Sequence, residues 1–145
     1  MRALIQRVGQ ASVTVDGELV GSCNKGLLIL LGVGADDTSQ NAIQLWNKIY
    51  RLRIFADEDE KTNLSLADID GEVLVVSQFT LFADCKKGNR PSFTQAAPQE
   101  KGRRLYEEFC ALAERDVRNV GRGVFGANMQ VSLTNDGPFT VWLER

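Results

Sequence analysis

The sequence contains no histidine, only three cysteines and three prolines, and no long apolar run. Without histidine, the Ser-His-Asp and Cys-His nucleophile systems are excluded, as are histidine metal ligands. Cys23, Cys85 and Cys110 are odd in number, widely spaced and without a C-x-x-C pattern. We therefore expect buried free thiols, with no disulfide, no metal and no cofactor. An enzyme built from this chain must find its proton transfers elsewhere.

No stretch approaches the roughly 20 apolar residues of a membrane helix. The first 18 residues also lack the apolar core and the small-residue cleavage site of a signal peptide. We therefore expect a cytoplasmic protein with no membrane partner. The 145 residues suit one domain, spanning residues 1–145, which is long enough to bury a sizeable core.

The formal net charge of −2 argues against a generally basic nucleic-acid-binding protein. The charge is unevenly placed, however, because residues 86–122 contain nine basic and five acidic side chains. Such a region is suited to contact phosphates while the whole chain stays acidic. The competing interpretation is an ordinary solvated helix face.

Several segments have strand patterns. "ALIQRV" and "ASVTVDGELVG" alternate between apolar and polar residues, and Asp16-Gly17 is a two-residue hairpin signal. Residues 26–33 form a continuous apolar run that predicts a strand covered on both faces, and residues 71–85 predict a second central strand. Near the end, residues 127–144 predict two strands joined by a turn at Gly137-Pro138.

Two helices are expected. Residues 36–39 offer N-caps to the first, and Pro98 is well placed in the first turn of the second. Their predicted apolar stripes consist of Ala42, Leu45, Trp46, Ile49 and Tyr50 for the first and Leu105, Phe109, Leu112 and Ala113 for the second. The predicted fold class is α/β, with two largely antiparallel or mixed β-sheets forming a barrel-like sandwich and two main helices packed on the outside.

Polar residues enter at the end of the second central strand, in "SQFTL". In a strand, Gln78 and Thr80 share one face, and Ser77 and Phe79 share the other. Thr80 or Ser77 would need an adjacent base to act as a nucleophile, and the nearby candidates lie on a solvated turn. A hydroxyl of the protein is therefore poorly activated as a nucleophile here. The alternative interpretation of this stretch is structural, with a strand that turns polar as it leaves the core.

The stretch "SLTNDGPFT", residues 132–140, poses a second question. Gly137-Pro138 either reverses the chain or presents its backbone to another molecule. Glycine at position 137 permits a close approach to the backbone, but the local pattern alone does not decide between the two.

Five motifs follow one another along the chain: "LIQRV", "RIF" followed by "NLSL", "LVVSQFTL", "RPSF" and "MQVSLTNDGP". Over the full length of the chain they resemble the D-aminoacyl-tRNA deacylase family. "SQFTL" combined with a late "NDGP" is the specific pair. The chain departs from the family pattern at Phe139, where valine is expected, and at Asn128, where aspartate is more frequent.

The resemblance implies hydrolysis of the ester that joins a D-amino acid to the terminal adenosine of tRNA, with the vicinal ribose hydroxyl assisting the reaction. Backbone N–H groups of Phe79 and Thr80 would polarise the carbonyl, as an oxyanion hole does. Ser77, Gln78, Met129 and Pro91 would shape the pocket.

The resemblance also implies a homodimer with a cross-subunit active site. A cis Gly137-Pro138 peptide would reach into the partner's pocket and exclude L side chains. Arg7 and Asn135 would support this motif. Glycyl-tRNA, including mischarged glycyl-tRNA for alanine, would be a second substrate.

Two other functions remain open. One is a small-molecule esterase with Thr80 as nucleophile, which predicts a covalent intermediate. The other is a non-catalytic RNA-binding module, suggested by the basic region of residues 86–122, which predicts tRNA binding without hydrolysis.

Overall fold

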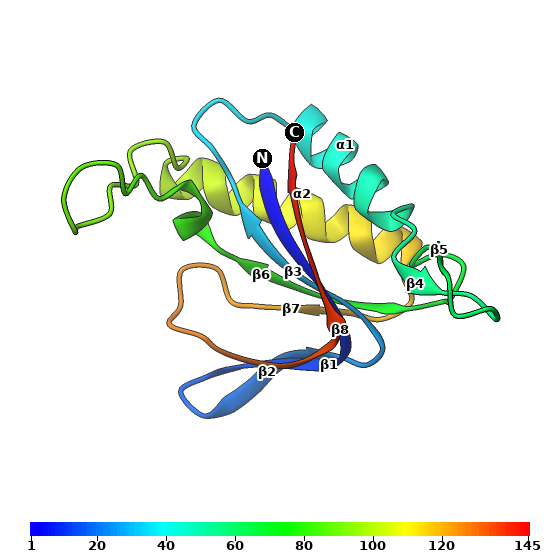
Figure 1. Ribbon diagram of the computed structural model, residues 1–145. Coiled ribbons are helices and arrows are strands. Elements are labelled where there is room, and N and C mark those ends of the chain that lie inside the picture. The colour runs from blue at the N-terminus through cyan, green and yellow to red at the C-terminus, as the bar shows by residue number, and fades with distance from the viewer.

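A strongly curved six-stranded sheet carries both main helices on one side, as a computed structural model of residues 1–145 shows (Figure 1). A small two-stranded hairpin completes the fold. The elements are β1 (Arg2–Val15), β2 (Glu18–Cys23), β3 (Gly26–Gly32), α1 (Ser39–Tyr50), β4 (Phe55–Ala56), β5 (Thr62–Leu64), β6 (Glu72–Ser77), the 3-10 helix η1 (Phe79–Phe82), α2 (Gln99–Asp116), β7 (Val120–Arg122) and β8 (Gln130–Glu144). The predicted fold class, a barrel-like mixed β structure with two outer helices, is confirmed.

The long strand β1 organises the sheet. The strand order is β2-β1-β3-β6-β7, and β8 pairs with the other edge of β1. The first half of β1 lies between β3 and β8, and its second half lies between β2 and β8. The Asp16-Gly17 hairpin is confirmed, because Val15 pairs with Glu18 across the turn.

The sheet comes close to closing where β2 approaches β7. A side chain at Gly21 or Gly121 would collide with the backbone of Arg122 or Ser22. Glycine at both positions therefore allows the two strands to approach, although no ladder of hydrogen bonds joins them.

The two central strands, β3 and β6, run parallel in register from Gly26 opposite Glu72 to Leu31 opposite Ser77. Val73 and Val75 of β6 belong to the large core under the helices. Leu74 and Val76 belong to a smaller core inside the curve of the sheet. Burial of both faces explains the continuous apolar sequence of these strands, and the predicted burial of residues 26–33 is confirmed.

Both helices bury their predicted stripes, with Tyr50 and Leu112 only partly covered. Trp46 and Phe109 meet edge to face, with ring centroids 5.7 Å apart. The helix α1 begins after Thr38, whose side chain and backbone exchange capping contacts with Asn41, and α2 begins directly after Pro98. Neither helix has the length and apolar character needed to span a membrane.

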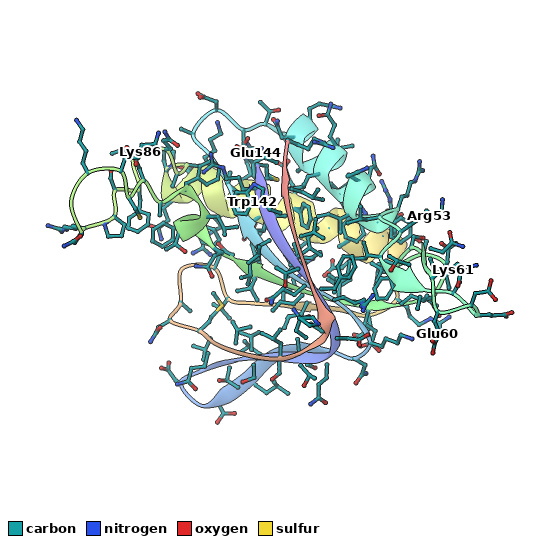
Figure 2. All side chains as sticks on the ribbon, in the orientation of Figure 1. Arg53, Glu60, Lys61, Lys86, Trp142 and Glu144 are labelled. Carbon is teal, nitrogen blue, oxygen red and sulfur yellow. The ribbon has the colours of Figure 1, made fainter.

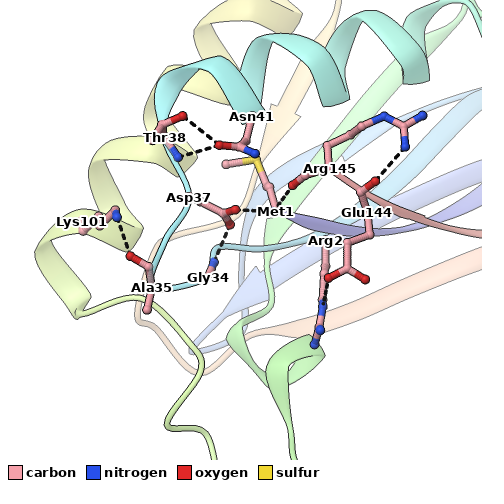
Figure 3. A network of polar contacts seen from close by, with 10 residues as sticks. All are labelled: Met1, Arg2, Gly34, Ala35, Asp37, Thr38, Asn41, Lys101, Glu144 and Arg145. Atoms are coloured by element: carbon pink, nitrogen blue, oxygen red, sulfur yellow. Dashed lines mark hydrogen bonds and ion pairs between the residues drawn. The ribbon is translucent and has the colours of Figure 1, made fainter.

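A buried carboxylate fixes the loop between β3 and α1 (Figure 3). Asp37 accepts hydrogen bonds from the backbone N–H of Gly34, at 2.6 Å, and from the amine of Met1. The backbone of Ala35 then bonds to Gln95, and that of Val33 to Ala97. The segment that precedes α2 is thereby attached to the end of β3.

The prediction of one strand over residues 71–85 is wrong beyond Ser77. The ladder with β3 ends there, and the N–H of Gln78 makes the last bond, 2.7 Å long, to the carbonyl of Leu31. With no partner strand left, the chain turns into η1, where the N–H of Leu81 bonds back to the carbonyl of Gln78. Gln78 and Thr80 therefore do not share a strand face.

The prediction that residues 127–144 form two strands joined by a turn is also wrong. A single strand, β8, runs along β1 through the motif. Val8 pairs with Asn135, and Gln6 pairs with Thr140. The chain therefore advances by two residues on β1 and by five residues on β8 between these two pairs. The three extra residues bulge outwards, which means that Gly137-Pro138 does not reverse the chain but protrudes from it.

The cysteines are free thiols, but only Cys23 and Cys110 are buried. The prediction of burial is wrong for Cys85, which lies exposed in the loop between η1 and α2. This loop contributes little to either core, so its side chains face solvent.

Gly26→Ala should lower the free energy of unfolding by about 3 kcal/mol, because the new methyl group overlaps the backbone carbonyl of Glu72 on the paired strand. Urea denaturation measures this change. Gly9→Ala is the control, since nothing lies within 4 Å of a Cβ at Gly9, and it should change stability by no more than about 0.5 kcal/mol. Equal midpoints for both variants would contradict the prediction.

Candidate active site

A cavity of about 490 Å³ opens where β6 ends. Its walls come from three segments: the end of β6 with the start of η1, the residues that lead into α2, and the stretch from β7 to β8. The lining residues are Val76, Ser77, Gln78, Phe79, Ala96, Ala97, Gln99, Phe125, Gly126, Ala127, Asn128, Met129 and Val131.

Every side chain of this lining is neutral and non-titrating. Phe79, Phe125 and Met129 supply aromatic and thioether surface, while the polar groups are amides and one hydroxyl. The volume and the mainly apolar character are typical of a site for a small organic group. No cluster of three or more histidine, cysteine, aspartate or glutamate side chains that could hold a metal is present.

The turn η1 begins at Phe79, a residue of the cavity lining, with two backbone N–H groups that lack an acceptor. The first N–H groups of a helix have no acceptor within it, and those of Phe79 and Thr80 donate to no side chain or loop carbonyl. The hydroxyl of Thr80 accepts a hydrogen bond from the amide of Gln78. Its side chain is exposed beside the cavity and is not part of the lining.

Arg2 of β1 contacts the second half of η1. Its Nη1 donates to the carbonyl of Leu81 at 3.0 Å, and its guanidinium lies 4.2 Å from the ring centroid of Phe82. Glu144 accepts a bond from Arg2 Nε at 2.9 Å. These contacts attach the end of η1 to β1 and β8.

The wall behind the cavity is pinned by Tyr106 of α2. Its hydroxyl lies 2.9 Å from the carbonyl oxygen of Val75 and 3.1 Å from that of Gly123. Its ring centroid is 5.8 Å from that of Phe125. Burial raises the pKa of Tyr106, and burial also raises the pKa of the neighbouring Cys110 thiol to about 11. Both groups therefore stay protonated at neutral pH.

A second polar cluster surrounds the bulge of β8. Arg7, which lies between the two shifted pairs of β1, donates from Nε to the carbonyl of Asp136 at 2.9 Å and from Nη1 to that of Ile54 at 2.6 Å. Its guanidinium lies 4.9 Å from the ring centroid of Phe139. The larger side chain at position 139 thus packs against the arginine behind the bulge.

Asn135 closes the base of the bulge. Its Oδ1 accepts the N–H of Phe139 at 2.6 Å, and its Nδ2 donates to the hydroxyl of Thr140 at 3.1 Å. The Gly137-Pro138 peptide is cis, and Gly137 has φ of +141°. Pro138 is exposed at the outer side of the bulge.

The structure separates the predicted site residues into two groups. Ser77, Gln78, Phe79 and Met129 line the cavity. Arg7, Asn135, Gly137 and Pro138 gather at the bulge, outside the lining of this cavity in the same chain. Pro91 is exposed in the loop before α2 and does not reach the cavity.

Sequence reasoning missed the wall formed by residues 125–128. The signal was the glycine-rich stretch "GRGVFGAN" before the last strand, since glycines between elements mark loops. The loop "NRPSFTQAAP", which contains the motif "RPSF", contributes Ala96 and Ala97.

Comparison with known proteins identifies the family. The family model described as D-Tyr-tRNA(Tyr) deacylase matches residues 4–144. Relatives named D-aminoacyl-tRNA deacylase from Thermotoga petrophila and Clostridioides difficile are 54% and 55% identical over 144 residues, covering 99% of this chain and 97% of each relative. The chain therefore belongs to the D-Tyr-tRNA(Tyr) deacylase family, and the resemblance predicted from the motifs is confirmed.

Solved structures share the fold. One named c-Myc DNA Unwinding Element Binding Protein is 41% identical, with a TM-score of 0.94 over 100% of this chain and 99% of that chain. A probable eukaryotic D-amino acid tRNA deacylase is 18% identical, with a TM-score of 0.86 over 98% of this chain and 97% of that chain. The latter likeness establishes the fold alone.

One thiol per native chain should react rapidly with Ellman's reagent at pH 8. Burial raises the pKa of Cys23 to about 12 and that of Cys110 to about 11, so the thiolate fraction of Cys110 is about one in a thousand at this pH. Cys85 is exposed. Three thiols should react in denaturant, and Cys85→Ser should abolish the rapid phase. A second rapid thiol in the native wild type would mean that Cys23 or Cys110 is accessible rather than buried.

Proposed function

We propose that this protein hydrolyses the ester of D-aminoacyl-tRNA and releases the D-amino acid and the tRNA. Family membership supports this activity, since the relatives are named D-aminoacyl-tRNA deacylase. The enzyme acts in the cytoplasm as one domain spanning residues 1–145.

The observation that carries the proposal is the neutral lining of the cavity beside Phe79. A side-chain mechanism needs an acid, a base or an activated nucleophile, and the lining contains no titratable group. An aminoacyl-tRNA brings its own hydroxyl next to the ester. The cavity therefore suits a substrate that supplies the reactive group itself.

In the proposed reaction, the terminal adenosine and the aminoacyl group occupy the cavity. Water attacks the ester carbonyl carbon, assisted by the ribose hydroxyl next to the ester. The N–H groups of Phe79 and Thr80 stabilise the oxyanion that forms. The carbon–oxygen bond to the ribose then breaks, and the ribose oxygen leaves with a proton. Ser77, Gln78 and Met129 hold the substrate in place, whereas Pro91 acts at most from outside the cavity.

We infer that the bulge of β8 acts on a partner subunit. Gly137 and Pro138 protrude from the strand and do not line the cavity of their own chain. The outer edge of β8 is unpaired, and Leu133 and Trp142 are exposed on it. A homodimer in which each subunit both gives and receives the bulge would complete two equal sites. Arg7 and Asn135 hold the bulge in shape.

Main-chain atoms of the bulge would then occupy the space of an L side chain. Such exclusion acts on any L-amino acid, whatever its side chain. Glycine has hydrogen on both sides of its α-carbon, so the same contact does not reject it. Glycyl-tRNA, including glycyl-tRNA mischarged for alanine, is therefore a second proposed substrate.

The two alternatives fit the site less well. An esterase with Thr80 as nucleophile lacks a base, because the only side chain bonded to the hydroxyl of Thr80 is the amide of Gln78. A module that only binds nucleic acid leaves the cavity and its two backbone donors without a use. The name of the 41% identical structure mentions DNA binding, and the assays below separate binding from hydrolysis.

Thr80→Ala should retain kcat within about threefold of the wild type on a D-aminoacyl-tRNA, because only the backbone of Thr80 takes part. Replacing the terminal ribose hydroxyl next to the ester by hydrogen should slow hydrolysis by about a hundredfold or more. Single-turnover assays measure both effects. An inactive Thr80→Ala variant, together with an acyl adduct on wild-type Thr80 detected by mass spectrometry, would establish the esterase instead.

Gly137→Ala should lower the preference for D- over L-aminoacyl-tRNA at least about tenfold. A Cβ here is strained at φ of +141° and would lie 3.0 Å from both Arg7 Nη2 and the N of Phe139, so the bulge must shift. The assay compares one tRNA charged with the D form, the L form and glycine. Wild type should cleave the D and glycyl esters, and Gly9→Ala, on the paired strand, should behave like wild type.

Two results would contradict the exclusion mechanism. The first is strict rejection of glycyl-tRNA by the wild type. The second is sedimentation of the wild type as a monomer at a concentration where it still rejects the L ester, because a monomer has no partner bulge in its cavity.

A further inference from the structure

The loop between η1 and α2 forms a projecting arm, which we define as residues 84–92. Two backbone bonds close its root: Asp84 N–H to Ser92 carbonyl at 2.8 Å, and Ser92 N–H to Asp84 carbonyl at 2.9 Å. Gly88, with φ of +65°, turns the chain near the tip. Figure 1 shows the arm extending beyond the sheet at one end of the molecule, with the β4–β5 hairpin at the opposite end.

The arm carries three cations without partners. Lys86, Lys87 and Arg90 are exposed, and none of their side chains makes an ion pair or a hydrogen bond in the structure. The acidic group of the arm, Asp84, is occupied at its root, where it accepts the N–H of Lys86 at 3.0 Å. The positive charge of the arm is therefore available to an external anion.

Several basic residues of α2 and β7, by contrast, form ion pairs. Arg104 pairs with Glu108, Arg115 with Asp116, and Arg122 with Glu114. Within residues 86–122, Arg104, Arg115, Arg118 and Arg122 thus pair with carboxylates, whereas Lys101 and Arg103 at the start of α2 and the three cations of the arm form no ion pair.

The charge of the molecule is also polarised along its length. Lys86 lies at one end, and Glu60 of the acidic turn at residues 57–60 lies at the opposite end (Figure 2). A polyanion approaching this field is drawn to the arm and repelled from the other end.

The arm is joined directly to the cavity. Phe93, one residue past the root, packs edge to face on Phe79 of the lining, with ring centroids 5.0 Å apart. On another side of the cavity, the guanidinium of the exposed Arg103 lies 5.3 Å from the ring centroid of Phe125. The root of the arm and Arg103 thus both adjoin residues of the cavity lining, so their positive charge lies on two sides of the cavity.

We propose that the arm binds the phosphodiester backbone of the RNA strand whose terminal nucleotide occupies the cavity, with Lys86, Lys87 and Arg90 as the phosphate contacts. This inference rests on the proposed function, because it assumes an RNA ester in the cavity. The tip at Gly88 lies four residue steps from the root at Asp84, so the arm reaches about 10–13 Å. At about 3.4 Å of axis per phosphate in one strand, that reach covers about three phosphates, one for each cation.

The test uses two triple variants of the full chain. The arm variant combines Lys86→Gln, Lys87→Gln and Arg90→Gln. The control variant combines Lys25→Gln, Lys48→Gln and Arg51→Gln, which removes three exposed cations with no ion pair of their own, away from the arm. Both leave every residue of the cavity lining unchanged. Each is assayed on a D-aminoacyl-tRNA and on the same D-amino acid esterified to adenosine alone.

The arm variant should raise KM for the tRNA substrate by about 10- to 100-fold, with kcat unchanged, and should hydrolyse the adenosine ester like wild type. The Kd for uncharged tRNA should rise by the same factor. The slope of log Kd against log salt should fall by about 2–3, as expected when three phosphate contacts are lost. The control variant should match the wild type in all of these measurements.

Equal KM, Kd and salt slope for the arm and control variants would overturn the proposal. So would an equal loss of activity on tRNA and on the adenosine ester, because the arm would then act only through the shape of the cavity. If the wild type cleaves neither ester, the proposed function fails. The binding of uncharged tRNA by the two variants then still decides whether the arm contacts phosphates.

Discussion

The parallel pairing of β3 with β6 is the constraint on which the rest of the structure depends. Both strands are buried on both faces, which commits their side chains to two separate cores. Their ladder ends at Leu31 and Ser77, and the bond from Gln78 to Leu31 is its last contact. The chain turns there into η1, whose first residue, Phe79, lines the cavity. The position of the proposed backbone donors is thus set by where the ladder stops.

The bulge of β8 arises from a mismatch between β1 and β8. Three more residues on β8 than on β1 push the backbone out of the ladder around Gly137. Arg7 occupies the place on β1 opposite the mismatch, and Asn135 joins the two ends of the protruding segment. The protrusion is therefore held by contacts from within the same sheet, so it can be presented to another molecule without an additional domain to support it.

The sequence predicted what depends on local periodicity and on pairs of adjacent motifs. The apolar stripes of the helices, the buried run of residues 26–33 and the Asp16-Gly17 hairpin are determined by the spacing of apolar residues and by turn chemistry. The end of β6 and the course of β8 were mispredicted because they depend on partner strands: Ser77 ends its strand where β3 ends, and Gly137 stays within a strand because β1 continues beside it.

In the candidate site, too, local motifs predicted some residues, while others depend on how distant segments pack together. Ser77, Gln78, Phe79 and Met129 could be placed by motif, whereas Phe125 and Asn128 come to the cavity only through the path of β7. The pairing of Arg104 with Glu108 follows the local i,i+4 spacing on α2, whereas the pairing of Arg122 with Glu114 depends on how α2 lies against β7 and has no local signal.

The contact between β2 and β7 at Gly21 and Gly121, here called the seam, has a consequence for local opening of the sheet. The strands meet through Gly21 and Gly121 without a hydrogen-bond ladder between them. Separating them breaks van der Waals contacts but no backbone hydrogen bonds, so this junction belongs to the least costly local openings of the sheet. The wall of residues 125–128 follows directly on β7. An opening of the seam would therefore act on a segment that leads into that wall, whereas Val76 and Ser77 of the opposite wall are held by the β3–β6 ladder.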